Sequence, residues 1–146
     1  MKKNKFLFHL LSFTWGLPMT LLGCIVALIM IVTGHKPQRF CDHIYFQVGE
    51  TLWGGLELGW IFFLTDCRPS NHTKCHEVGH SIQACVFGPL MPFIISIPSA
   101  IRYWYREWLV RSGRKKYSEL PDYDSIWFEG QASKLGEKYY QSYKTE

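Results

Sequence analysis

The uncharged stretch near the N-terminus constrains the fold more than any other feature of this chain. Residues 6–35 contain no Asp, Glu, Lys or Arg, and residues 21–32 are almost wholly aliphatic. Such a run exceeds the about 20 residues that a helix needs to cross a bilayer. Lysines at positions 2, 3 and 5 precede it, as in an anchor whose N-terminus stays in the cytoplasm. Because no small-residue cleavage site closes the run, we expect residues 1–35 to form a retained transmembrane helix rather than a signal peptide.

The rest of the chain has the composition of one mixed domain, which we place at residues 36–146. The length of 146 residues suits a single domain, and the mean hydropathy of −0.06 shows that the apolar character does not extend throughout. The net charge is only +4, with basic residues gathered over 111–116. This basic segment is either a solvated loop or a contact with anionic lipid headgroups. The sequence contains no nucleic-acid motif, so we expect the lipid bilayer as partner, and not DNA or RNA.

Residues 44–64 have two interpretations, a helix or a pair of strands. As a helix they would form a second membrane span carrying two glutamates and four glycines, which is unfavourable in lipid. As strands they show alternating apolar side chains over 44–48 and again over 56–62, with Gly54-Gly55 as a two-residue turn. We favour a β-hairpin, preceded by a linker over 35–43. Together with the helices expected on either side, this predicts an α+β fold.

The pentapeptide His-Glu-Val-Gly-His, which begins at His76, predicts a metal site. Positions i and i+4 share one face of a helix, so His76 and His80 can direct ring nitrogens at the same ion. Zn²⁺ is the expected ion, with Glu77 beside it as the general base that takes a proton from the attacking water. We expect this helix over residues 73–87, ending at Gly88-Pro89.

After this helix the chain stays apolar but is interrupted by prolines. Residues 78–101 carry no Asp, Glu, Lys or Arg, and prolines occupy positions 89, 92 and 98. This pattern argues against an uninterrupted spanning helix, and we expect residues 89–110 to form a kinked, membrane-associated segment. The aromatic residues and arginines over 102–108 are typical of a membrane–water interface, or of an amphipathic helix packed on protein.

The last helix should follow the N-cap candidates Asp122 and Asp124 and continue to about residue 143. Glu129 borders its apolar face, so its carboxylate should point toward the protein. We choose Glu129 as the third zinc ligand, brought beside the histidines by packing of the two helices. The small residues Gly79 and Ala132 should permit that close approach. The alternative is a buried acid paired with a nearby Lys or Arg.

The cysteines give little further constraint. There are five, without CxxC spacing, which argues against a cysteine zinc site. Cys41 and Cys67 flank the predicted hairpin and can form a disulfide if that region faces an oxidising compartment. Sequence spacing leaves this pairing open.

Four short blocks are more specific together than the pentapeptide alone. They read HEVGHSIQ from His76, FGPL from Phe87, IPSA from Ile97 and IWFEGQA from Ile126. Over about residues 40–137 the chain resembles a family of small, largely uncharacterised bacterial membrane proteins, which implies the bacterial cytoplasmic membrane. More distantly, the HExxH helix followed by a Glu-x-x-Ala helix is similar to the gluzincin metallopeptidases, including the CAAX prenyl proteases. That resemblance implies peptide-bond hydrolysis, with His76, His80 and Glu129 as zinc ligands and Glu77 as general base.

One position departs from the gluzincin pattern. Four residues after the ligand Glu, that family usually has an Asp that orients a ligand histidine, whereas this chain has Ser133. Ser133 can form a hydrogen bond but carries no charge, so the departure bears on proteolysis more than on zinc binding. Tyr123 is the candidate that we consider for stabilising the oxyanion.

Three functions stay open. The leading hypothesis is a membrane-anchored zinc metallopeptidase that acts on a peptide or protein substrate. The first alternative is an intramembrane protease similar to the site-2 proteases, although no Asp, their third ligand, lies in an apolar run here. The second is a non-enzymatic membrane protein with a structural or vestigial zinc site. The number of spans and the face that carries the site stay open, because the N-terminal lysines and the segment 111–116 indicate opposite sides.

Overall fold

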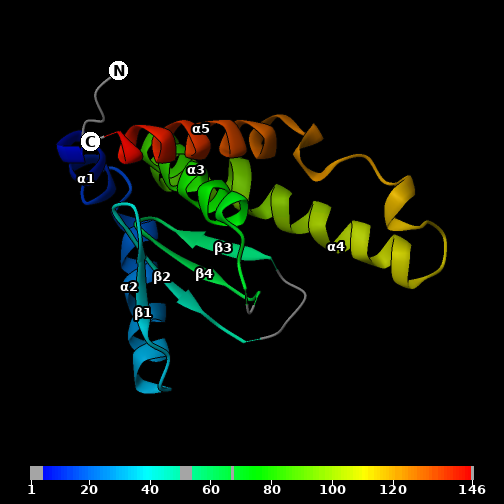
Figure 1. Cartoon of the computed structure of the whole chain (residues 1–146), viewed down its shortest axis with the longest axis horizontal. Helices are drawn as coiled ribbons and strands as arrows, with labels where there is room; N and C mark the ends of the chain where they lie inside the picture. Colours follow the sequence, from blue (N-terminus) through cyan, green and yellow to red (C-terminus); the bar gives the residue numbers. More distant parts are fainter. Residues whose placement is uncertain (1–4, 50–53, 67, 146) are drawn as a thin grey trace.

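The protein has an α+β fold in the computed structural model, which describes residues 5–49, 54–66 and 68–145 (Figure 1). The α-helices are α1 (Lys5–Ser12), α2 (Leu17–Val32), α3 (Asn71–Phe87), α4 (Ile97–Arg111) and α5 (Trp127–Lys144). The strands are β1 (Pro37–Phe40), β2 (His43–Gln47), β3 (Gly55–Leu58) and β4 (Ile61–Leu64). Short helical turns lie at Gly88–Leu90, Pro92–Ser96, Tyr117–Glu119 and Tyr123–Ser125. The predicted fold class is therefore confirmed.

The strands form one mixed sheet in the order β1-β2-β4-β3. β1 pairs with β2 and β3 with β4 in antiparallel fashion, while β2 and β4 are parallel. β3 therefore lies at an edge of the sheet. The tight turn between β3 and β4 contains Gly59, whose φ of 71° lies in the left-handed region that favours glycine.

The predicted hairpin pairs the wrong strands. β2 and β3 are not neighbours in the sheet, and Gly54-Gly55 is not a turn between them, because Gly55 is the first residue of β3. β2 pairs instead with β1, which lies in the segment predicted as a linker. Alternating apolar side chains indicate a strand and its faces, but the partner depends on how the whole sheet packs.

Helices cover both faces of the sheet. On one face, Phe46 and Phe63 belong to the same buried cluster as Ala27 of α2. On the other face, Phe62 packs with Val78 of α3. Figure 1 shows α5 lying along α3, farther from the sheet than α3 is. α3 is thus enclosed between the sheet and α5, which explains why a helix with so many polar side chains is largely buried.

The N-terminal segment forms two helices rather than one. α1 and α2 are bent by 83° relative to each other. Pro18 in the first turn of α2 suits a new helix start, because proline lacks the amide hydrogen that a continuous helix would use there. No single helix of the described residues is both long and apolar enough to cross a membrane, although α1 and α2 qualify as a bent pair. The continuous transmembrane helix over 1–35 is therefore unconfirmed.

The chain changes direction sharply after α3. Gly88 ends the helix with a φ of 52°, and a methyl group on Gly88 would lie 2.6 Å from Cδ1 of Trp15. The segments Asn71–Leu90 and Pro92–Arg111 are bent by 114°. The bend confirms that the proline-rich segment over 89–110 is kinked, whereas its membrane association stays a prediction.

Candidate metal centre

α3 and α5 pack backbone to backbone. A methyl group built on Gly79 would lie 2.7 Å from the Cα of Ala132 and closer still to its carbonyl oxygen. One built on Gly136 would lie 2.9 Å from the amide nitrogen of Gly79 and closer still to the carbonyl of Cys75. Non-bonded carbon atoms normally stay about 3.5–4.0 Å apart, so neither glycine tolerates a side chain without movement of the helices. The prediction that Gly79 and Ala132 permit a close approach is confirmed.

The two helices begin differently from each other. α3 starts at Asn71, where the Ser70 side chain accepts a hydrogen bond of 3.1 Å from the Thr73 amide and so caps the helix. α5 starts at Trp127 without a side-chain cap, so the predicted capping role of Asp122 and Asp124 is wrong. The Asp124 carboxylate is engaged by Ser133 instead.

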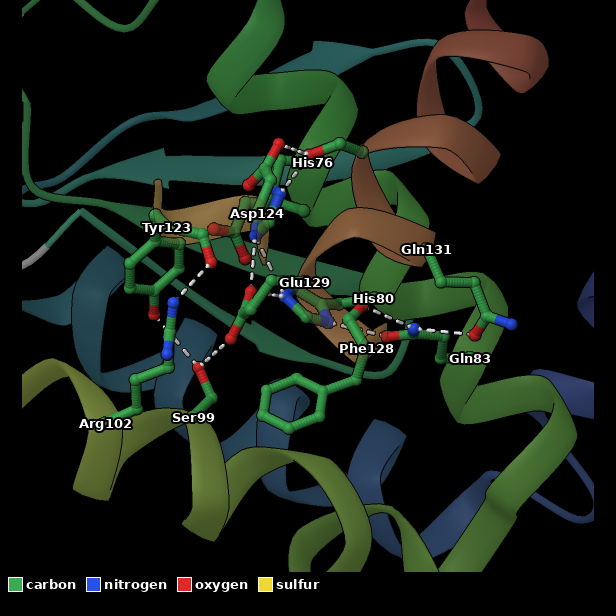
Figure 2. Close-up of polar contacts among 12 residues, drawn as sticks. His76, His80, Gln83, Ser99, Arg102, Tyr123, Asp124, Phe128, Glu129 and Gln131 are labelled. Carbon is green, nitrogen blue, oxygen red and sulfur yellow. Dashed lines mark hydrogen bonds and ion pairs between the residues drawn. The ribbon is translucent and has the colours of Figure 1, made fainter. Parts of the chain in front are cut away.

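The predicted ligands converge. Nε2 of His76 lies 3.0 Å from Nε2 of His80 and 3.0 Å from Oε2 of Glu129, and Nε2 of His80 lies 3.2 Å from the same Oε2 (Figure 2). Ligand atoms that bind a tetrahedral zinc at about 2.0–2.1 Å are about 3.3 Å from one another. The three atoms therefore have nearly the mutual spacing of three corners of a zinc tetrahedron. Among the described residues this is the group of His, Cys, Asp and Glu side chains that can hold a metal ion.

Hydrogen bonds orient His80 for metal binding. Its Nδ1 lies 2.8 Å from Oε1 of Gln83, while Nε2 of Gln83 donates to the Phe128 carbonyl at 2.8 Å and to Gln131 at 2.9 Å. With its amide nitrogen engaged in this way, Gln83 presents an oxygen that can only accept, so Nδ1 of His80 carries the proton. In the neutral ring, the lone pair of Nε2 then faces the other ligand atoms.

His76 is oriented by a two-residue relay. Its Nδ1 lies 2.8 Å from Oγ of Ser133, which donates to Oδ2 of Asp124 at 2.7 Å. Because the hydroxyl hydrogen points to Asp124, its oxygen accepts from Nδ1 and leaves the Nε2 lone pair for a metal. A carboxylate thus supports the histidine despite the serine at position 133, acting through the hydroxyl from the turn before α5.

Glu129 is held at its second oxygen as well. Its side chain is fully buried, and Oγ of Ser99 on α4 donates to Oε1. Oγ of Ser99 also lies 3.1 Å from the Tyr123 hydroxyl. Burial by itself would raise the pKa of Glu129, but the hydrogen bonds that its Oε2 shares with Nε2 of His76 and of His80 while no metal is bound outweigh burial and lower the pKa below its usual range. The carboxylate therefore stays ionised, as a metal ligand must be.

Glu77 lies against the sheet. Its side chain is 5% exposed, and a methyl group on Gly55 of β3 would lie 2.5 Å from its carboxyl carbon. Burial raises the pKa of Glu77, partly opposed by the two histidines. A raised pKa is the direction that suits a carboxylate exchanging a proton near neutral pH.

His80 carries extra proton affinity while no cation is bound. Burial lowers its pKa, but the hydrogen bond with Glu129 and the charges of Glu77, Glu129 and Glu57 raise it to about 9. These carboxylates create a negative environment that a proton or a metal ion can neutralise. The donor set, its spacing and its charge therefore fit a divalent zinc ion.

A cavity of about 480 Å³ opens on these ligands. It is bordered by His76, His80, Glu77 and Glu129, by β3, and by α4 with the residues around Tyr123. The bent path of the chain after α3 brings α4 to this cavity. The metal site is therefore accessible to a small ligand or an extended segment rather than sealed in the core.

Sequence reasoning named the ligands but missed several supporting residues. Gln83, Ser99 and Glu57 were not assigned a role at the site, although Gln83 and Ser99 lie in the quoted sequence blocks, and Asp124 was given a capping role. Ser133 was the available signal for Asp124, since a serine beside a ligand histidine requires an acceptor for its own hydrogen. Cys67 lies outside the described residues, so its disulfide with Cys41 stays a prediction. No family model, curated protein or solved structure matches the chain.

Proposed function

We propose that the protein is a membrane-anchored zinc metallopeptidase, with His76, His80 and Glu129 as ligands and Glu77 as general base. The observation that carries the proposal is the convergence of three ligand atoms from α3 and α5 at 3.0–3.2 Å, beside a buried glutamate and an open cavity. Two His and one Glu leave the fourth corner of a zinc tetrahedron to water or substrate, which distinguishes a catalytic site from a closed structural one.

Zinc held by His76, His80 and Glu129 would supply a Lewis acid and lower the pKa of water toward 7. Glu77 would accept the proton of the attacking water at its carboxylate and give it to the leaving amine as the peptide C–N bond breaks. The wall formed by Gly55 keeps this carboxylate at the edge of the cavity and away from bulk water. Its burial makes an uncompensated charge unfavourable, which promotes proton uptake during the reaction.

Tyr123 supplies a donor for the oxyanion in this proposal. It borders the same cavity, and its hydroxyl lies 3.1 Å from Oγ of Ser99. Burial and the charge of Glu129 raise the pKa of Tyr123 to about 12, so the hydroxyl keeps its hydrogen at neutral pH. Because Ser99 gives its only hydrogen to Glu129, the Tyr123 hydroxyl donates to Ser99 in the free site, and it would turn this hydrogen to the substrate to stabilise negative charge on a carbonyl oxygen.

The membrane assignment is supported by apolar side chains that face outward. On α2, Leu21, Ile25, Leu28 and Val32 are more than half exposed, with fractions from 53% to 80%. Along the bent segment after α3, apolar side chains are exposed as well, for example Phe93 at 70%. Contiguous apolar surface of this kind is unusual for a protein surrounded by water and is typical of contact with lipid or another protein.

Two other functions remain as outcomes of the test. A protease similar to the site-2 enzymes would require an Asp ligand, whereas in the described residues the acid that converges with the two histidines is Glu129. A non-enzymatic zinc protein would keep the metal but show no hydrolysis. The open cavity and the buried Glu77 favour the enzyme.

The test is metal analysis of the full-length protein in detergent, combined with a peptide-library cleavage assay. We expect one zinc per chain, lost in His80→Ala. Glu77→Gln should retain zinc and lose cleavage by at least about 100-fold, since general-base catalysis contributes about 10²–10⁴-fold. Glu119→Gln, at an exposed acid that does not border the cavity, is the matched control and should behave as wild type. Absence of zinc, or full activity of Glu77→Gln, would refute the proposal.

A further inference from the structure

Glu57 is a second buried acid at the cavity that the zinc site does not use. It lies on the edge strand β3, two residues after Gly55, so both point to the same face of the sheet. Gly55 contacts Glu77, which places this face against α3. On β3, Glu57 lies about 7 Å beyond Gly55, and on α3, His80 lies one turn beyond Glu77. The negative charge of Glu57 raises the pKa of His80. β3 therefore runs beside the metal-binding stretch of α3.

Among the described residues, no hydrogen bond of normal geometry reaches the carboxylate of Glu57, although the backbone at Gly59 lies close enough to lower its pKa. The side chain is 5% exposed. Burial raises the pKa of Glu57 to about 8, which reflects how unfavourable its unpaired charge is. Buried polar groups in native proteins nearly always have partners, so an unpaired carboxylate at the wall of a cavity indicates a missing ligand.

The chemistry of that ligand follows from the surroundings. A buried carboxylate whose oxygens have no hydrogen bond of normal geometry favours a cationic group or a further hydrogen-bond donor beside it. Glu57 is not among the acids that converge with His76 and His80, so it does not belong to the zinc ligand set. A second divalent ion would need several oxygen ligands, whereas a primary ammonium is satisfied by one or two carboxylates.

We propose that Glu57 binds the free α-ammonium group of a peptide substrate, which makes the protein an aminopeptidase. The inference rests on the proposed zinc peptidase function and specifies its substrate class. In a peptide, the α-amine is two bonds from the first carbonyl carbon, so an amine at Glu57 keeps that carbonyl close to the zinc ligands. A longer side-chain amine such as that of lysine would place the reacting carbonyl farther away. The cavity of about 480 Å³ is large enough for one or two residues.

The experiment compares two zinc-binding probes that differ only at the amine. Leucine hydroxamate carries a free α-amine, and N-acetyl-leucine hydroxamate does not. Both are titrated calorimetrically into zinc-loaded full-length protein in detergent, as wild type, Glu57→Gln and the control Glu119→Gln. We expect wild type and the control to bind the free amine at least about tenfold more tightly. Glu57→Gln should lose this preference, keep its affinity for the acetylated probe and keep one zinc per chain.

Each other result has a defined meaning. Equal affinity of the two probes for wild type, or a preference that survives in Glu57→Gln, overturns the amine assignment. So does a second zinc per chain that Glu57→Gln loses, because the acid then serves a metal. If zinc binds but neither hydroxamate does, the metal is closed to ligands and the peptidase function fails together with this inference. If the preference is found but no peptide is cleaved, the amine-binding role of Glu57 stands, whereas the peptidase function and the aminopeptidase assignment are refuted. Glu57→Asp keeps the charge and should retain part of the preference.

Discussion

Replacing Gly79 by alanine should abolish tight zinc binding although no ligand is changed. The new methyl carbon would lie 2.7 Å from the Cα of Ala132, against a normal carbon separation of about 3.5–4.0 Å. α3 and α5 must therefore separate by about 1 Å. The histidines are on α3 and Glu129 is on α5, so the separation is transmitted directly to the ligand set. Metal–ligand distances tolerate only about 0.2 Å, and Glu129 would be lost as a ligand.

The expected loss of zinc affinity is at least about 100-fold, because losing even an outer-shell partner weakens metal binding about 10–100-fold. A competing effect is the helix propensity of alanine, which favours the variant by about 1 kcal/mol, so the protein should still fold. Zinc Kd is measured by competition with a chromophoric chelator, with circular dichroism as the check on folding. Lys134→Ala, at an exposed position of α5, is the control. A folded Gly79→Ala protein that binds zinc within threefold of wild type would refute this account of the helix crossing.

Three further outcomes follow from the contacts. Asp124→Asn should weaken zinc binding about 10–100-fold, and Ser133→Ala should give a similar loss. The two losses should not add in the double variant, because both residues act on His76 through one relay; additive losses would contradict the relay. Glu57 has a pKa raised to about 8, so the folded metal-free protein holds a proton that the unfolded chain releases above its ordinary pKa of 4.5. The free energy of unfolding of wild type therefore falls as the pH rises between these two values. Relative to wild type, the free energy of unfolding of Glu57→Gln should rise by about 1.4 kcal/mol per pH unit over this range, as measured by denaturant unfolding. A difference that does not depend on pH would exclude this burial effect. Ser70→Ala should lower the free energy of unfolding by about 1 kcal/mol without altering zinc affinity, and an unchanged denaturant midpoint would show that the cap contributes nothing.

Local patterns were sufficient for part of this protein. The spacing of the two histidines requires only that residues 76–80 be helical, and helix α3 satisfies that condition. Glu129 was identifiable because an acid at the border of an apolar helical face needs a buried partner. Gly79 and Ala132 indicated a close crossing because small side chains let two helix backbones approach each other.

Other features depended on contacts between distant segments. The pairing of β2 with β4 rather than β3 is not encoded by alternation, which is identical for any partner. The position of Asp124 in the sequence could not show whether it caps the helix or accepts the hydrogen bond from Ser133, because both roles use the same residue type at the same end of a helix. Ser99 reaches Glu129 only because the chain bends by 114° after α3.

The candidate metal ligands and the existence of strands and helices were readable from the amino-acid sequence, because periodicity and residue chemistry act over a few positions. The orientation of those ligands, the unpaired Glu57 at the cavity wall and the division of the N-terminal run into α1 and α2 emerged only when the segments were packed together. Hydrogen-bond partners, burial and charge pairing are properties of three-dimensional neighbours, and residues 57, 99 and 124 become neighbours of the histidines only in the folded chain.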